Sequence, residues 1–173
     1  CETPDLLRVM DCLEREGLIA GPRLVVGFSM GGGIAVQYAA ADPACRGLVA
    51  LAPVAAADLI MRRMLRIMCP LLSEPVLRAA VARAGQMAGF DPATVSAIRA
   101  AAGIRFPAVV IHGRLDLTVP PSHGRAVFDA LGGPKELVRP WAPHGTVLMG
   151  REEWIARRLV AMAEHRGAQC RKE

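Results

Sequence analysis

The stretch VVGFSMGGG, residues 25–33, places a single hydroxyl, that of Ser29, between Gly27 and Gly31. The apolar, β-branched run RLVVGF at 23–28 leads into it, and a helix-like segment follows. A tight strand-to-helix turn exposes a nucleophilic serine, and it requires small residues two positions before and after that serine. A flexible loop that contains a serine by chance is the alternative. Because the flanking strand and helix stand where such a turn needs them, we predict that Ser29 is a nucleophile.

The helix expected after Ser29 contributes to the same chemistry. Its first backbone N–H groups have no partner inside the helix, and the helix dipole makes this end positive. We therefore expect the amide of Met30 to donate a hydrogen bond to a developing oxyanion. The five-residue pattern G-x-S-x-G is weak by itself, so the prediction also needs a base and an orienting acid.

His144 is the predicted base and Asp116 the predicted acid. His144 lies in WAPHGT, just after the apolar run at 135–140, and Asp116 lies in HGRLDLTVP, just after the run at 107–113. In open α/β sheets, ligands gather at the carboxyl ends of the strands, which is where both residues fall. The chain order serine, aspartate, histidine, which begins at Ser29, is also the order found with this type of turn.

Other side chains are alternatives for these roles. Asp58, just after the run at 46–53, is the alternative acid. His112 ends a strand near the site but precedes a glycine turn, His123 begins a helix, and His165 lies near the end of the last helix. We expect His123 to be structural and His165 to be solvated, and none of the three is the preferred base.

Short apolar runs alternate with amphipathic segments along the chain. The runs are nearly continuous, which is typical of parallel strands covered by helices on both faces. The predicted fold class is α/β, a mostly parallel sheet flanked by helices with a helical cap insertion. Strands are expected at 23–28, 46–53, 107–113 and 135–140, and helices at 6–13, from 34 onward, at 122–131 and at 151–165.

The cap insertion is expected at residues 54–104, so that 1–53 and 105–173 form the core domain. Its segments carry clear helix start and stop signals, among them Asp followed by Pro. We expect it to fold over a site at the edge of the sheet. Its three helices are predicted at 57–68, from Ser73 to about Gly89, and from Asp91-Pro92 to Gly103.

Methionines give the cap soft, adaptable side chains, and we expect Met61, Met64 and Met68 to contact a substrate. Phe28, the residue before the predicted nucleophile, is expected to contact it too. The alternative for the methionines is that they fill the core between cap and sheet.

The composition excludes several classes of function. The chain has 173 residues, 53% of them hydrophobic and 21% charged, which is typical of one globular domain. The net charge of +5 is dispersed and only 4% of residues are aromatic, so a nucleic-acid partner is not expected. Charges, Gly and Pro interrupt every apolar stretch, so no membrane span is expected. No metal site and no cofactor are predicted.

The five cysteines are odd in number and form no CxxC pair. Such usage favours neither a disulfide framework nor a zinc site, and it fits a reducing compartment such as the cytoplasm. We expect Cys45 and Cys69 to be buried as small hydrophobic residues.

With these motifs the chain resembles the α/β-hydrolases. GFSMGGG and APHG are most similar to the branch that contains bacterial arylesterases and cofactor-free haloperoxidases, although the cap does not match theirs. The resemblance implies that Ser29 is the nucleophile, His144 the base and Asp116 the acid, with the Met30 amide as oxyanion donor. The dehalogenase and epoxide hydrolase relatives are disfavoured, because they need a carboxylate at position 29.

The leading functional prediction is a serine hydrolase that cleaves a small, largely apolar carboxylic ester through an acyl-enzyme. One alternative is perhydrolase or haloperoxidase activity, in which peroxide replaces water. A second alternative, from another class, is a truncated and inactive domain that binds a ligand or a partner.

Members of the resembled family have several strands before the turn that holds the nucleophile, and a loop among them donates a hydrogen bond to the oxyanion. Here only 28 residues precede Ser29. We therefore expect the sequence to correspond to the C-terminal half or two-thirds of such an enzyme, without the loop that gives the second oxyanion donor. The strand at 23–28 would then present an open apolar edge. Self-association, or an upstream segment that covers this edge, is the expected consequence.

Overall fold

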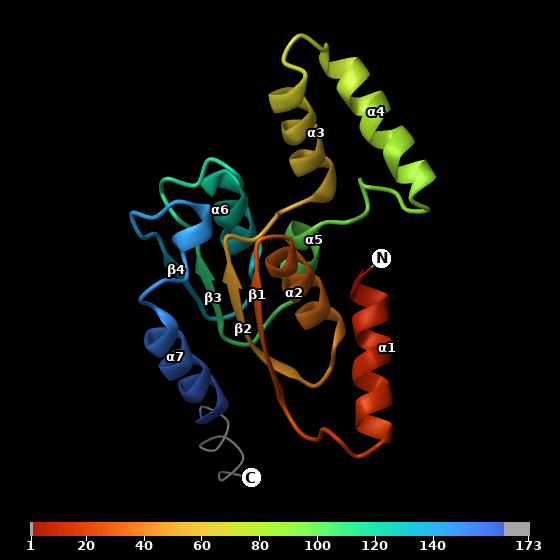
Figure 1. Cartoon of the computed structure of the whole chain (residues 1–173). Helices are drawn as coiled ribbons and strands as arrows, with labels where there is room; N and C mark the ends of the chain where they lie inside the picture. The colour runs from red at the N-terminus through yellow and green to blue at the C-terminus, as the bar shows by residue number, and fades with distance from the viewer. Residues whose placement is uncertain (1, 165–173) are drawn as a thin grey trace.

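A computed structural model of the chain describes residues 2–164, and its centre is a four-stranded parallel sheet (Figure 1). The strand order follows the sequence, β1-β2-β3-β4, and each neighbouring pair is parallel. The strands are β1 (Arg23–Phe28), β2 (Cys45–Leu51), β3 (Ala108–Ile111) and β4 (Lys135–Val138). The predicted α/β fold class and all four predicted strands are therefore confirmed, although β2, β3 and β4 each end two residues before the predicted limit.

The described part of the chain contains seven α-helices. The helices predicted beside the sheet are found with small differences at their ends. They are α1 (Glu2–Arg15), α2 (Met30–Ala41), α3 (Ala57–Met68), α4 (Glu74–Met87), α5 (Ala97–Ala101), α6 (Pro121–Ala130) and α7 (Glu152–Glu164).

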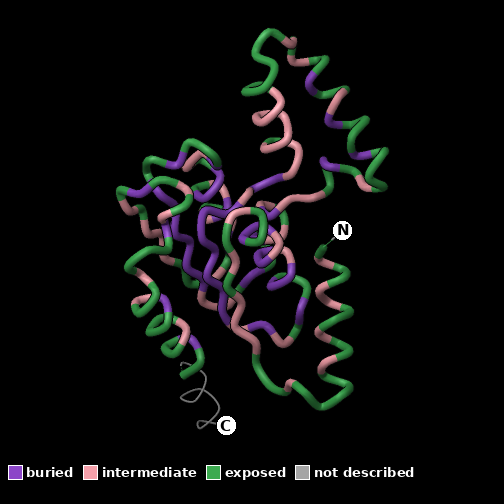
Figure 2. Tube along the Cα trace, in the orientation of Figure 1, coloured by how far each residue is buried: buried purple, intermediate pink, exposed green. Residues whose placement is uncertain are grey.

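The core forms two layers, one on each face of the sheet. Alternate residues of the central strands point to opposite faces, so Leu48 and Val110 face one layer while Val49 and Ile111 face the other. Helices α2, α5 and α6 cover the first face, and α7 covers the second. The central strands β2 and β3 are accordingly almost wholly buried, whereas the edge strands β1 and β4 are half-buried or exposed (Figure 2).

Strand β2 ends two residues earlier than its apolar sequence suggests. The expected run reached residue 53, but Ala52 has a φ of 43° and turns the chain away from the sheet. Its N–H still donates to the carbonyl of Ile111 over 2.7 Å, which ties the turn to β3. A positive φ at a residue other than glycine is unusual, and it cannot be read from an apolar run.

The segment predicted as a cap is not uniform. Helices α3 and α4 pack against each other and extend away from the sheet (Figure 1), and their residues are mostly half-buried or exposed (Figure 2). Helix α5 differs, because Ala97 and Ala101 belong to the core against α2 and α6. The division of the chain into a core and a cap at residues 54–104 stays a prediction.

The third helix of this segment begins at Ala97, after the N-cap Ser96, rather than at Asp91-Pro92, so the predicted start is wrong. The Oδ1 atom of Asp91 accepts from the N–H of Ala93 at 2.9 Å, and its carbonyl accepts from Thr94 Oγ1 at 2.7 Å. Asp91 therefore closes a turn with its own side chain, which competes with helix capping. Ser96 is the cap instead, because its Oγ accepts from the N–H of Arg99.

The cysteine predictions have mixed outcomes. Cys45 is buried in β2 as expected, whereas Cys69 is exposed because it lies just past the end of α3. Both are free thiols, as is Cys12. None of the helices within residues 2–164 is long and apolar enough to cross a membrane. No cluster of three potential metal ligands occurs among those residues either.

Candidate active site

Ser29 occupies the tight turn between β1 and α2, and its backbone is strained. Its φ of 57° lies in the left-handed region that residues with a side chain rarely adopt. Hydrogen bonds to the segment after β2 hold this turn in place. The Ser29 N–H donates to the carbonyl of Leu51 at 2.8 Å, and the Ser29 carbonyl accepts from the N–H of Val54 at 3.1 Å. Strain held in place by surrounding hydrogen bonds is common at functional sites.

The glycines around Ser29 have different roles. A Cβ atom at Gly27 would lie 2.3 Å from the carbonyl oxygen of Gly31 and 2.6 Å from the Cβ of Ala35, so only glycine fits there. A Cβ atom at Gly31 would meet nothing within 4 Å. The expectation that both positions must be small is therefore right for Gly27 and wrong for Gly31. The close contact on the helix side is made instead by Gly33, where a Cβ would lie 2.5 Å from the Val54 carbonyl.

The structure brings Ser29, His144 and Asp116 together. The Nε2 atom of His144 lies 2.9 Å from Ser29 Oγ, and its Nδ1 atom lies 2.6 Å from Asp116 Oδ2. The three residues follow β1, β4 and β3, so they meet at the carboxyl edge of the sheet. With Nδ1 protonated and donating to the carboxylate, Nε2 is free to accept the serine hydroxyl proton. This arrangement can activate a serine for attack on a carbonyl carbon.

The carboxylate of Asp116 is buried but has a full set of hydrogen-bond donors. The residue is 2% exposed, and its Oδ1 accepts from the N–H groups of Thr118 at 3.0 Å and Val119 at 2.8 Å. The Oδ2 atom accepts from His144. A carboxylate held by backbone donors on one oxygen can present the other in a fixed direction.

His112 is a second histidine on this carboxylate, and sequence reasoning did not find that role. Its Nε2 lies 2.9 Å from the carbonyl oxygen of Val119 and 3.3 Å from Asp116 Oδ2. A carbonyl can only accept, so Nε2 carries the proton and points it between the two oxygens. Burial lowers the pKa of His112 and keeps it neutral. Its position at the end of β3 was the available signal.

Phe28 packs on His144 itself. The two rings lie 4.9 Å apart between centroids and are tilted by 36°. Such a contact restricts the orientation of the imidazole. Phe28 is not among the described residues that line the cavity beside Ser29, so its predicted contact with substrate stays a prediction.

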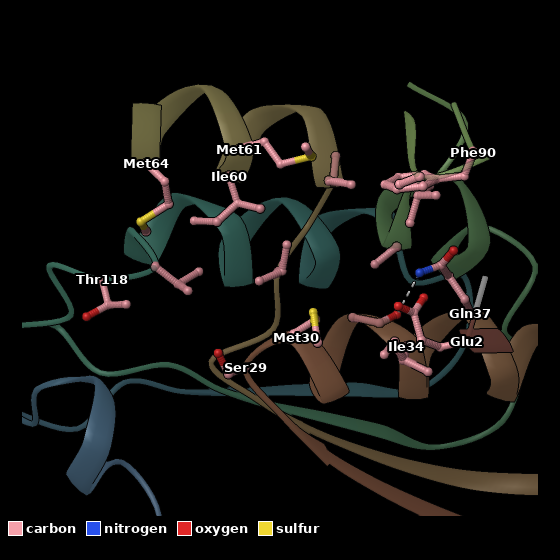
Figure 3. Close-up of a pocket in the computed structure, with 18 residues that line it drawn as sticks. Glu2, Ser29, Met30, Ile34, Gln37, Ile60, Met61, Met64, Phe90 and Thr118 are labelled. Atoms are coloured by element: carbon pink, nitrogen blue, oxygen red, sulfur yellow. Dashed lines mark hydrogen bonds between the residues drawn. The ribbon is translucent and has the colours of Figure 1, made fainter. Parts of the chain in front are cut away.

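A cavity of about 520 Å³ opens beside Ser29, between α2 and α3 (Figure 3). Its walls are mostly apolar. Of the three methionines predicted to contact a substrate, Met61 and Met64 line this cavity, whereas Met68 does not and is 76% exposed at the end of α3. The principal lining residues that were not predicted as contacts are Ile34, Gln37, Ile60, Phe90, Thr118 and Val119.

Residues 4–99 match the family described as serine aminopeptidase, S33. The chain belongs to the serine aminopeptidase S33 family. No curated protein matches the sequence. The expectation of an α/β-hydrolase is thereby confirmed, and the Ser29 turn lies inside the matched region.

Solved structures show the same fold at low sequence identity. The acetyl xylan esterase from Paenibacillus sp. R4 superposes with a TM-score of 0.67 and 23% identity, covering 92% of this chain and 51% of its own. The acetyl xylan esterase 1 from Thermoanaerobacterium sp. JW/SL YS485 gives 0.60 and 17%, covering 80% and 45%. The monoacylglycerol lipase of Paleococcus ferrophilus gives 0.59 and 19%, covering 94% and 76%. This S33 chain therefore spans about half the length of the two xylan esterases.

The remaining candidates in this S33 chain lie apart from Ser29. Asp58 pairs with Arg62 at 3.0 Å on α3, so the structure brings Asp116 and not Asp58 to His144. His123 accepts the N–H of Ala55 through Nδ1 at 3.1 Å, and burial lowers its pKa, as a structural role requires. His165 lies outside the described residues.

The predicted oxyanion donor has the expected position in the chain. Helix α2 begins at Met30, so the amides of its first turn have no carbonyl partner within the helix. The positive end of the helix lies at Ser29, where charge would develop during attack on a carbonyl. The role of the Met30 amide stays a prediction.

Proposed function

We propose that this chain is a serine hydrolase that cleaves carboxylic esters through an acyl-enzyme. Ser29 is the nucleophile, His144 the general base and acid, and Asp116 the residue that orients the imidazole. The observation that carries the proposal is the pair of contacts made by His144, 2.9 Å to Ser29 Oγ and 2.6 Å to Asp116 Oδ2. Two hydrogen bonds on opposite nitrogens of one imidazole are the geometry that general-base activation of serine requires.

The reaction follows from these positions. Ser29 Oγ bonds to the ester carbonyl carbon as its proton passes to His144 Nε2, and the amide of Met30 stabilises the oxyanion. The carbon–oxygen bond to the alcohol then breaks, and the alcohol leaves with the proton from Nε2. Water attacks the acyl-enzyme by the same route in reverse, releases the acid and restores Ser29.

The choice of esters is supported by the surroundings of Ser29 and by the neighbours in fold. The cavity beside Ser29 is largely apolar, which suits the uncharged body of an ester better than a charged or sugar substrate. Several structural neighbours carry the names of esterases or of a lipase. Among predicted substrate contacts, Met61 and Met64 stand on the cavity wall.

The direct test is labelling by a fluorophosphonate probe, followed by hydrolysis of a p-nitrophenyl ester. Only an activated serine reacts with the probe, so we expect labelling of the parent chain and none of Ser29→Ala. We expect His144→Ala to lose labelling too, with kcat reduced about 10⁴- to 10⁶-fold. Each variant should unfold at the same temperature as the parent, which shows that the loss of labelling does not come from a loss of folding.

Three outcomes separate the alternatives. A parent chain that is folded but unlabelled would favour a binding domain over an enzyme. Product formation that requires peroxide would favour a perhydrolase or haloperoxidase. Undiminished ester hydrolysis by Ser29→Ala would contradict the proposed mechanism.

A further inference from the structure

Two helices face each other across the cavity without packing together. Helix α2 packs on β1, β2 and α5, while α3 packs on α4. Each helix nevertheless turns a stripe of residues with the spacing i, i+3, i+4, i+7 toward the space between them, which is the spacing of one helix face. The two stripes are Met30, Gly33, Ile34 and Gln37 on α2, and Ala57, Ile60, Met61 and Met64 on α3.

Both stripes are apolar apart from Gln37, whose side-chain amide donates to the carbonyl of Gly33 at 3.2 Å. Ile60, Met61 and Met64 are half-buried, with much of their apolar surface directed at the cavity. A face of this kind is stabilised when apolar atoms fill the space in front of it. The occupant that fits is an apolar chain lying along the helix axes.

The cavity has a defined direction with Ser29 at one end. Figure 3 shows Ser29, Met30 and Thr118 on one side, and Phe90, Gln37 and Glu2 on the other. Helix α2 starts beside Ser29 and runs toward the distant side. Residues later in α2 therefore lie farther from the nucleophile.

The position of His144 decides which part of an ester enters. His144 must protonate the leaving alcohol, so the alcohol oxygen lies on the histidine side of Ser29. His144 is not among the described residues that line the cavity. The acyl group extends away from the histidine, and it is therefore the part of the substrate that enters the cavity.

The length of the acyl group follows from the helix. Gln37 lies eight positions after Ser29 in the sequence, which corresponds to about 12 Å along an α-helix. An extended alkyl chain advances about 1.25 Å per bond, from bond lengths near 1.52 Å and angles near 111°. We infer that the cavity is the acyl site for an unbranched chain of about eight to ten carbons, bounded at its far end by Phe90 and Gln37. This inference rests on the proposed function, and it names the substrate class of the same site.

The test is a series of p-nitrophenyl esters from acetyl to palmitoyl, assayed below their critical micelle concentrations. We expect kcat/KM to rise about two- to fourfold per added methylene up to the octanoyl or decanoyl ester, and then to fall. In Ile34→Trp the indole would block the middle of the cavity, and the ratio of decanoyl to acetyl rates should fall about 100-fold or more. Phe90→Ala should move the optimum to longer chains.

The matched control is Val160→Trp, which adds the same indole at an exposed position of α7, away from the cavity. Its chain-length profile should equal that of the parent. A parent rate that falls steadily from the acetyl ester, or identical profiles in the parent and Ile34→Trp, would overturn the inference.

A second measurement separates the inference from the proposed function. Calorimetry on Ser29→Ala, which cannot hydrolyse esters by the proposed route, should show decanoate binding more tightly than butyrate. Adding Ile34→Trp should remove that preference. Decanoate binding of this kind in a chain that hydrolyses no ester would refute the enzyme and leave the cavity assignment standing. Ser29-dependent hydrolysis without a chain-length preference or decanoate binding would support the enzyme and refute the cavity assignment.

Discussion

The Nε2 atom of His144 lies 2.9 Å from the Oγ of Ser29, although 115 positions of the sequence separate the two residues. The contact exists because β1 and β4 end at the same edge of the sheet, where Ser29 directly follows β1 and His144 lies in the loop six positions after the end of β4. The imidazole is held from two further sides, by Asp116 on Nδ1 and by the ring of Phe28.

Asp116→Asn should lower kcat for ester hydrolysis about 10⁴-fold while leaving the chain folded. The side-chain oxygen of Asn can still accept from Thr118 and Val119, but its amide would direct N–H groups at His144. The imidazole would then carry its proton on Nε2, where it cannot accept the hydroxyl proton of Ser29. Steady-state kinetics with a p-nitrophenyl ester measures the loss.

The matched control for that variant is Asp58→Asn, which removes the same charge from a partly exposed ion pair with Arg62. Such pairs contribute about 0–1 kcal/mol to stability, so its activity and unfolding should stay close to those of the parent. A large loss of activity at Asp58 with a mild one at Asp116 would move the acid to Asp58.

Gly27→Ala and Gly31→Ala add one methyl group each on either side of Ser29, and we expect opposite effects. At Gly27 the new Cβ would overlap the backbone of Gly31 and the side chain of Ala35, so stability should fall by about 2–3 kcal/mol. At Gly31 the Cβ meets nothing, and alanine favours helix by up to about 1 kcal/mol over glycine. Urea denaturation of both variants checks the pair, and equal destabilisation would show that the helix start is packed more closely.

Stability should fall as the pH is lowered below the ordinary histidine range. Burial lowers the pKa values of His112 and His123 from 6.5 in the folded chain, so below that pH the unfolded chain binds protons that the folded chain does not. Each histidine then contributes a slope of up to about 1.4 kcal/mol per pH unit, between its folded pKa and 6.5. Above this window the contribution is constant.

His123→Gln removes the contribution of His123 to the pH dependence of stability and leaves that of His112. The Gln oxygen can still accept from the Ala55 N–H, but it does not titrate. Urea denaturation of the parent and the variant at about pH 7.5, 6.5 and 5.5 should give a shallower acid loss in the variant. Parallel curves would mean that His123 titrates alike in the folded and unfolded chains.

Local patterns were sufficient to predict much of this fold. The predicted limits 23–28 and 57–68 coincide with those of β1 and α3, because each segment carries its own signals of period and termination. The Ser29 turn was predictable for the same reason, since strand, serine and glycines are consecutive. That Asp116 and His144 lie at the same edge was predictable too, because the carboxyl ends of parallel strands lie at one edge of the sheet.

Close contacts between distant segments could not be predicted in this way. The sequence pattern does not reveal that Gly31 has free space while Gly33 touches the carbonyl of Val54. It does not distinguish Asp91 as a turn residue from Asp91 as a helix cap, because both roles use the same side-chain oxygen. The shared carboxylate of His112 and His144 likewise depends on how a loop folds back on its strand.

The final prediction concerns β1, the first strand of the sheet order, which pairs with β2 and leaves its other edge without a strand in the described residues. Val26 and Phe28 lie on one face beside this edge and are 47% and 42% exposed. Parallel strands are normally covered, and an open apolar edge pairs with other chains. We therefore expect the chain to self-associate, with an average mass in sedimentation that rises with concentration.

Val26→Lys should reduce that association, because a charge at an edge strand opposes pairing. Val160→Lys is the matched control, since it places the same charge at an exposed valine on α7 and should leave the association unchanged. If both variants lowered the mass equally, net charge rather than the β1 edge would govern association. A parent chain that stayed monomeric at every concentration would show that the edge is not an interface between copies.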